Sequence, residues 1–344
     1  MGKDVDIRGR GVSACCAAHL LAQQGFSVCL EQASRSGPAR LLLSGQTQLL
    51  FREIFGDPQL FEAAPRIRCR VVAWGAEAPP VELPHSGVVV SEQELLDHLW
   101  QKIEIPGDVS LQRETTDAGW TILSAPLPSQ AWESRAFGDR KACTRAVRLV
   151  AQARHDCCWI ESLPDGWLFL LPYSEGRAML ISTGYLPGSL IEQSRLIAAQ
   201  ITELEAAGEP AIQFSAYPQT LCELSGMRWL ACGSAAMRFD PLCGEGAGHA
   251  VREGLLAAAV IRGAARGYSS DTLLAHYNQR LMQGFLRHLQ VCLPFYQSGG
   301  QSDFWQAEAS ALQTGIRWME ARLEGETPPL YRLSGYQLEP IAGN

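Results

Sequence analysis

The stretch that decides the fold is Asp4–Ala14, DVDIRGRGVSA, near the start of the chain. Val5–Ile7 predicts a short apolar strand, and Gly9 allows a tight turn out of it. Apolar residues then recur at helical spacing until Gly25, which ends the predicted helix. Phe26–Leu30 predicts a second strand. We therefore expect a β-α-β unit at this end of the chain.

This unit has the features of a dinucleotide site. Gly11 would let the backbone approach a pyrophosphate, and Ala14 is small enough for close packing of helix on strand. The N–H groups and the dipole of the helix N-terminus would hold phosphates. Glu31 ends the second strand, where an acidic side chain bonds ribose hydroxyls. The residues assigned to this half of the site are Gly9, Gly11, Val12, Ser13, Ala14, Glu31 and Gln32.

A second glycine-rich segment, Ala231–Gly246 (ACGSAAMRFDPLCGEG), lies far downstream. Met227–Ala231 predicts a strand that feeds it, and a helix is expected from His249 to Arg262. Glycines before a helix expose N–H groups to an anion or an electron-rich ring. The two segments together predict one long dinucleotide held at both ends, which favours FAD over NAD. The positions assigned here are Gly233, Ser234, Asp240, Pro241, Gly244, Glu245, Gly246 and Ala247.

Composition is that of a globular enzyme. The 344 residues are enough for two domains or for one large domain with a sizeable core, and 47% of them are hydrophobic. The net charge of −7, without a basic run, argues against nucleic acid as the partner. No apolar stretch is long enough to span a membrane, and the chain enters its first strand too early for a signal peptide. The expected location is the cytoplasm.

The eleven cysteines predict neither a disulfide framework nor a metal site. Their number is odd, no C-x-x-C pair occurs, and two adjacent pairs lie in apolar runs, at Cys15–Cys16 and Cys157–Cys158. Neighbouring residues on a strand point to opposite faces and are poorly placed to share one metal. We expect buried, reduced thiols.

The remaining elements alternate between helix and strand. Pro164–Gly166 predicts the turn of a hairpin. Other expected elements are a helix over 47–55, an extended run over 67–75, a strand over 87–90, a helix over 92–102 capped by Ser91, a strand over 177–185 and a helix over 190–207. The predicted fold is α/β, a Rossmann-like FAD-binding domain with a parallel sheet interleaved with a mainly antiparallel β-sheet substrate domain and followed by a C-terminal helical region. The predicted bounds are 1–45, 86–145 and 222–265 for the first, 46–85 and 146–221 for the second, and 266–344 for the third.

The two glycine segments resemble those of FAD-dependent monooxygenases with the p-hydroxybenzoate-hydroxylase-type fold, and more nearly the tryptophan halogenase-like branch. That family has G-x-G-x-x-G/A, a strand-ending Glu and a later G-D-A-A-x-x-x-D-P-x-x-G-x-G segment, which contacts the flavin. Phe295–Tyr296 and Phe304–Trp305 resemble the tail of the branch, and Ala136–Arg140 resembles its A-T-G-R element. The resemblance also assigns Arg40 and Gln93 to the cofactor.

Two residues depart from the family pattern at positions that contact the flavin in that family. Ser234 stands where the family has the Asp that holds the ribityl hydroxyls, and Gln93 stands where it has an arginine. A serine still donates and accepts a hydrogen bond, so FAD remains the expected cofactor. Loss of tight FAD binding, as in a non-catalytic relative, is an open alternative.

Halogenation is a further alternative. The W-x-W-x-I-P motif of halogenases corresponds to Trp167–Pro172, WLFLLP, with Phe169 at the second tryptophan. The only lysines are Lys3, Lys102 and Lys141, and none lies where the halogenase lysine is expected. The branch also includes flavoproteins that oxidise a tryptophan of a partner protein to build a quinone cofactor, and the closing run over 331–340 resembles those more closely.

The resemblance implies a mechanism in which a flavin C4a-hydroperoxide transfers oxygen to an aromatic substrate, either a small molecule or a tryptophan in a protein or peptide. Glu245, in the glycine loop, is the candidate catalytic residue. No separate NAD(P)H fingerprint occurs, so a flavin reductase or transiently bound NAD(P)H would supply electrons. A flavin reductase or dehydrogenase similar to geranylgeranyl reductases is the remaining alternative.

Overall fold

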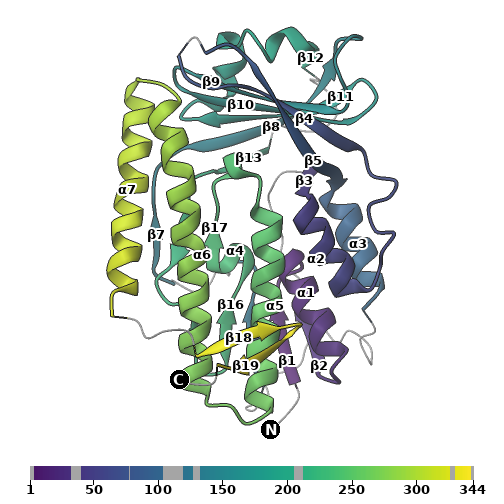
Figure 1. Ribbon diagram of the computed structural model, residues 1–344, viewed down its shortest axis with the longest axis vertical. Helices are drawn as coiled ribbons and strands as arrows, with labels where there is room; N and C mark the ends of the chain where they lie inside the picture. The colour runs from purple at the N-terminus through teal and green to yellow at the C-terminus, as the bar shows by residue number, and fades with distance from the viewer. Residues whose placement is uncertain are drawn as a thin grey trace.

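The computed structural model describes residues 4–31, 40–76, 78–103, 119–126, 132–204, 212–325 and 330–341. Figure 1 shows a broad sheet at one end of the molecule, with a smaller sheet and long helices beneath it. Both termini lie at the opposite end. The expected α/β fold, with a parallel sheet, antiparallel sheets and C-terminal helices, is confirmed.

The smaller sheet contains the predicted β-α-β unit. β1 pairs in parallel with β2 on one side and with β6 on the other, and β6 pairs in parallel with β16. Helix α1 (Val12–Ala22) joins β1 to β2 and is buried along almost its whole length. In spatial order the strands are β15 (Ser225–Gly226), β16 (Trp229–Ala231), β6 (Trp120–Leu123), β1 (Asp4–Arg8) and β2 (Ser27–Glu31).

The larger sheet is mainly antiparallel; its parallel pair is β4 with β9. The predicted hairpin is confirmed at β9–β10. In spatial order the strands are β12 (Ile201–Leu204), β8 (Lys141–Leu149), β11 (Arg177–Gly184), β10 (Gly166–Ser174), β9 (Cys157–Leu163), β4 (Arg66–Ala73), β5 (Val81–Ser91) and β3 (Arg40–Ser44), with β13 (Ile212–Ser215) also paired to β8. Smaller sheets are formed by β17 (Met237–Arg238), β14 (Gln219–Leu221) and β7 (Ser134–Ala136), and by β18 (Tyr331–Ser334) with β19 (Gln337–Pro340).

The predicted Ser91 cap is confirmed, and α2 has comparable signals at both ends. The Ser44 and Ser91 side chains accept hydrogen bonds from backbone N–H groups in the first turns of α2 and α3. Gly56, at φ 60°, ends α2 in the left-handed conformation. The helices are α2 (Gly45–Phe55), α3 (Glu92–Gln101), α4 (Gly233–Ala236), α5 (Gly246–Ala265), α6 (Ser270–Ser298) and α7 (Asp303–Leu323), with short 3-10 helices η1 (Pro187–Gln193), η2 (Ala198–Gln200) and η3 (Pro241–Cys243).

Indole side chains bind α6 and α7 to the larger sheet. The Trp167 Nε1–H donates to the Tyr296 hydroxyl at 3.1 Å, and the Trp305 Nε1–H donates to the Leu163 carbonyl at 2.8 Å. Trp74 donates to the Phe295 carbonyl. The aromatic pairs noted in the sequence therefore hold the C-terminal helices against the sheet, and Figure 1 shows one end of α6 and of α7 beside this sheet.

The prediction of a helix over 190–207 is wrong. The described part of this segment forms η1, η2 and β12, and β12 pairs with β8. The buried Glu161 carboxylate accepts hydrogen bonds from the backbone N–H groups of residues 195–197 and from the Ser194 hydroxyl. These bonds fix a tight turn that a continuous helix could not make.

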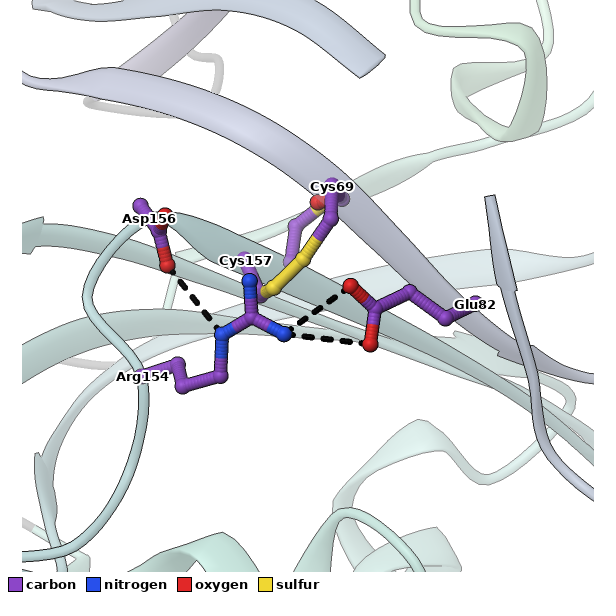
Figure 2. The surroundings of a disulfide bond; sticks show 6 residues. Cys69, Glu82, Arg154, Asp156 and Cys157 are labelled. Atoms are coloured by element: carbon purple, nitrogen blue, oxygen red, sulfur yellow. Dashed lines mark hydrogen bonds and ion pairs between the residues drawn. A yellow bond between two sulfur atoms is a disulfide. The ribbon is translucent and has the colours of Figure 1, made fainter. Parts of the chain in front are cut away.

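The expectation that the cysteines are reduced is also wrong for one pair. Cys69 on β4 and Cys157 on β9 form a disulfide, because the parallel register places them directly opposite each other (Figure 2). Arg154 lies beside this bond and pairs with Glu82 and Asp156. The two cysteines are 88 residues apart in sequence, so spacing did not reveal them. Cys15, Cys16 and Cys158 are free and buried, as expected.

The predicted domain bounds remain a prediction. β5 and β8 are continuous strands of the larger sheet, and the bounds at 85/86 and 145/146 fall inside them. Residues 266–341 contain α6 and α7, as expected for a helical region, together with the β18–β19 hairpin. Among the described residues, no helix combines the length and apolar character that crossing a membrane requires.

The disulfide predicts a stability difference. Cys69→Ser is expected to lower the free energy of unfolding by about 2–5 kcal/mol, because the bond closes a long loop in the unfolded chain. Urea unfolding under non-reducing conditions measures this loss, with Cys222→Ser, at a half-buried free cysteine, as the control. Equal stability of the two variants would contradict the assignment.

Candidate functional site

The two glycine segments, distant in sequence, meet at Ser13. A Cβ at Gly233 would collide with the Ser13 side chain, and a Cβ at Gly254 on α5 would collide with the Ser13 backbone. At Gly9, with φ 122°, a Cβ would lie 2.5 Å from the Ser124 Oγ at the end of β6. Only glycine permits these approaches. The predicted convergence of the two segments is therefore present in the structure.

The first segment has a cradle suited to a pyrophosphate. Helix α1 begins after Gly11, and no side chain caps its N-terminus. The first N–H groups of a helix have no partner within it. The Ser124 Oγ beside Gly9 is buried and has no hydrogen-bond partner. An uncapped helix start beside an unpaired hydroxyl fits the phosphate half of FAD, with Val12, Ser13 and Ala14 in the first turn.

The second segment ends in an open loop before α5. Gly244 has φ 65°, and a Cβ at Gly244 or at Gly246 would meet nothing within 4 Å. Glu245 is the N-cap residue of α5, whose N-terminus also has no side-chain cap. A flat ring can approach such a surface closely. The structure thus fits the flavin half of FAD in front of the α5 N-terminus, beside Ala247.

The Glu245 side chain belongs to a small polar group. A Cβ at Gly248 would lie 2.9 Å from the Glu245 Oε2, 2.7 Å from the Thr47 Oγ1 and 3.1 Å from the Arg252 NH1. These three side chains therefore gather around Gly248, where the start of α2 meets the start of α5. Glu245 is half-buried and keeps its side chain at the edge of the open loop.

The two departures from the family pattern take local partners. The Ser234 hydroxyl donates to the Ser124 carbonyl at 3.3 Å, so it lies at the junction of the two segments. Gln93 donates to both carboxylate oxygens of Asp97 at 2.9 Å, and Arg10 contacts the same carboxylate. The Gln93 bonds thus lie within α3, and it is the Arg10–Asp97 pair that joins α3 to the loop that precedes α1.

Asp240, predicted to bind the cofactor, is fully buried beneath the loop. One carboxylate oxygen pairs with the Arg140 guanidinium, and the other accepts the Leu242 N–H. Arg140 also pairs with Glu308 on α7 and lies 4.4 Å from the ring centroid of Tyr296. Both Asp240 oxygens are engaged within the protein, so this side chain shapes the loop, while Pro241 starts η3.

Burial shifts the pKa of several groups around this network. Burial alone would lower the pKa of the Arg140 guanidinium, but the neighbouring acids, led by Asp240, raise it. Burial lowers the pKa of His288 and of His249 to about 4 each. Neutral His288 accepts the Asp240 N–H at Nε2, 2.9 Å away, and His249 stacks on Phe239. Both histidines support the loop by packing and hydrogen bonding.

A buried carboxyl group supports the turn at Gly233. The Glu253 Oε2 on α5 accepts the Gly233 N–H at 2.5 Å. Burial raises the pKa of Glu253 to about 8, and the Gly233 hydrogen bond opposes this rise. Sequence reasoning missed Glu253 and Glu308, because a single acid inside a helix has no distinguishing pattern.

The remaining predictions are placed as follows. Arg40 lies on β3 at the edge of the larger sheet, 4.5 Å from the Tyr173 ring centroid. The Glu31 side chain and Gln32 lie outside the described residues. Ala136–Arg140 begins at the last residue of β7, in the three-stranded sheet, and delivers Arg140 to the buried network.

A cavity of ≈ 150 Å³ adjoins the second segment. It lies between the end of β6, helix α4 and the three-stranded sheet, and its lining includes Ser234, Trp132 and Arg238. The cavity is too small to contain a whole dinucleotide, but it extends the open space on the Ser234 side of the junction.

The buried ion network predicts a large stability loss. Arg140→Met is expected to cost about 3–5 kcal/mol, because it leaves two buried carboxylates without a counter-ion. Arg135→Met removes an exposed ion pair with Glu133 and is expected to cost less than about 1 kcal/mol. Urea unfolding compares them, with Arg140→Lys expected in between. Similar losses for both Met variants would contradict a central role for Arg140.

Glu253 predicts a pH dependence of stability. Its folded-state pKa of about 8 lies above its ordinary value of 4.5, so this group's contribution decreases as pH rises from about 4.5 to 8. The slope is at most about 1.4 kcal/mol per pH unit. Glu253→Gln is expected to remove this contribution in urea unfolding between pH 6.5 and 8.5, and the histidine effects, common to parent and variant, cancel in the difference between them. Exposed Glu94→Gln is the control, and an unchanged slope in Glu253→Gln would contradict the assignment.

Comparisons with known proteins agree with this geometry. No protein-family model and no curated protein matches the sequence. Among solved structures, the myxobacterial chondrochloren halogenase CndH, an FAD-dependent halogenase, matches with a TM-score of 0.78 and 16% identity over 94% of this chain and 91% of that one. The peptidyl tryptophan dihydroxylase QhpG matches with a TM-score of 0.75 and 19% identity over 98% and 86%.

Klebsiella pneumoniae HpxO, solved with FAD and uric acid, matches with a TM-score of 0.65 and 16% identity over 92% of this chain and 95% of that one. At these identities the comparisons establish the fold. The chain has the fold shared by flavin-dependent halogenases and hydroxylases, which confirms the resemblance of its glycine segments to that group.

Proposed function

We propose that this chain is an FAD-dependent monooxygenase that hydroxylates an electron-rich aromatic ring, with a tryptophan side chain of a partner protein as the leading substrate. The observation that carries the proposal is the junction at Ser13, where the start of α1 packs against the turn at Gly233 and the middle of α5. This packing fixes α1 and α5 relative to each other, and neither helix has a side-chain cap at its N-terminus. Two such N-termini suit a ligand with both a pyrophosphate and an electron-rich ring.

The chain's own residues supply binding and orientation. The α1 N-terminus and the Ser124 hydroxyl would hold the pyrophosphate, and the Ser234 hydroxyl would take the place of the family's acid at the ribityl chain. The α5 N-terminus would place positive potential at the ring edge. Bound FAD would supply the oxygen-transfer chemistry. Glu245, at the open loop, would orient the substrate or move its proton.

Support for tryptophan comes from the match with QhpG, which acts on peptidyl tryptophan and covers 98% of this chain. Electrons would come from a flavin reductase or from NAD(P)H, and the proposed location is the cytoplasm. Halogenation is the second candidate, because the match with CndH is equally extensive. Lys102 is paired with Asp57 at the end of α3, and Lys141 lies on β8; Lys3 lies outside the described residues. Neither described lysine lies where the resemblance places the halogenase lysine, which favours hydroxylation.

A product assay separates the two candidates. FAD-loaded protein is supplied with NADH and a flavin reductase, then offered a tryptophan-containing peptide or free tryptophan, with and without bromide. We expect the peptide to gain the mass of oxygen, independent of bromide. A bromine isotope pattern would establish halogenation, and reduced flavin consumption without any modified product would contradict both candidates.

Two variants serve as controls in this assay. Glu245→Gln is expected to lower turnover at least about tenfold, because it removes a proton-transfer group. The affinity for FAD is expected to stay unchanged. Glu94→Gln, on the exposed face of α3, is expected to leave turnover unchanged. Equal turnover of the two variants would remove Glu245 from the mechanism.

A further inference from the structure

Two free cysteines lie in contact behind the glycine loop. The Cys243 Sγ, in the last residue of η3, is 3.4 Å from the Cys292 Sγ on α6. Cys243 is half-buried, whereas Cys292 is fully buried. Gly244 and Gly246, which border the open loop, follow Cys243 directly. The pair therefore joins the loop to the long helix that packs beneath it.

His288 lies beside the two thiols, and its hydrogen bond determines which chemistry these three side chains can support. The thiols and the His288 ring nitrogen lie close enough together to surround a metal ion. However, the His288 Nε2 already accepts the Asp240 N–H at 2.9 Å, and the same Nε2 is the atom 3.5 Å from the Cys292 Sγ. Binding a metal there would leave a buried N–H without a partner. Two thiols alone are too few ligands for a tetrahedral zinc site, so chemistry between the sulfurs is favoured.

We propose that Cys243 and Cys292 form a reversible disulfide that links the glycine loop to α6. A disulfide has an S–S bond of about 2.05 Å, so the sulfurs need to approach by only about 1.4 Å. Side-chain rotation at the half-buried Cys243 can supply this movement. The pair is independent of the proposed function, because it is defined by protein atoms alone.

Hydrogen peroxide is the oxidant. The Cys243 thiolate attacks one peroxide oxygen, the O–O bond breaks, and a sulfenic acid and, after protonation, water result. The Cys292 sulfur then attacks the Cys243 sulfur, the S–O bond breaks, and the hydroxyl leaves with the Cys292 proton as a second water. In total, two thiols and one peroxide give one disulfide and two waters, with two electrons passing from the sulfurs to the peroxide.

The order of attack follows from exposure. Peroxide can reach Cys243, which is partly exposed, whereas Cys292 is buried and its pKa is raised by its hydrogen bond to Cys243 and by burial. Cys243 is therefore the sulfur that reacts first, and Cys292 resolves the intermediate. The linked loop would lose freedom next to Gly244, the residue with open space around it.

Thiol counting and peptide mapping test the proposal on the whole protein. After treatment with a stoichiometric amount of hydrogen peroxide, we expect the loss of two thiols per chain and a Cys243–Cys292 linked peptide by mass spectrometry. Dithiothreitol should restore both thiols. The Cys69–Cys157 linked peptide serves as an internal reference, because it should be present before peroxide is added.

Matched variants sharpen this test. Cys243→Ser should abolish both the linked peptide and the paired thiol loss, and Cys292→Ser should leave Cys243 oxidised without a link. Cys222→Ser, at another half-buried free cysteine, should behave as the parent protein. Two outcomes would overturn the proposal. In one, a bound metal protects the thiols of the parent protein from peroxide. In the other, peroxide-treated protein contains no Cys243–Cys292 linked peptide. Neither outcome depends on flavin or on turnover.

Discussion

The close approach of three backbone segments at Ser13 is the constraint on which the rest of the site depends. The start of α1, the turn at Gly233 and the middle of α5 all pack there, and the contacts at Gly233 and Gly254 leave no space for a Cβ. Interiors are close-packed, so this approach fixes the position of α5 relative to α1. The N-termini of both helices are consequently fixed relative to each other.

A second layer of interactions holds the loop from below. Arg140 connects Asp240 in the loop to Glu308 on α7, and Tyr296 on α6 covers the guanidinium. Trp167 then ties Tyr296 to the larger sheet. Through these contacts the sheet, the C-terminal helices and the glycine loop form one continuous support. Burial of these charges is tolerated because the guanidinium pairs with both carboxylates.

The sequence predicted the elements whose local signals are strong. The β-α-β unit and the Ser91 cap follow from glycine, spacing and capping residues and are confirmed. The helix over 190–207 failed because Glu161, distant in sequence, captures the backbone of that segment. The Cys69–Cys157 disulfide and the role of Arg140 depend likewise on strand register and on tertiary contacts. Local patterns carry no information on such partners.

The central claim is that both glycine segments hold one FAD molecule. Fluorescence titration of the purified chain with FAD tests it most directly, using Gly233→Ala and a control, Gly176→Ala, whose glycine also has positive φ but lies in an open hairpin turn. The account predicts that FAD binds to one site per chain, at least about tenfold more weakly (about 1.4 kcal/mol) in Gly233→Ala, and with parent affinity in Gly176→Ala. No FAD binding by the folded parent chain, or equal affinity in both variants, would contradict it.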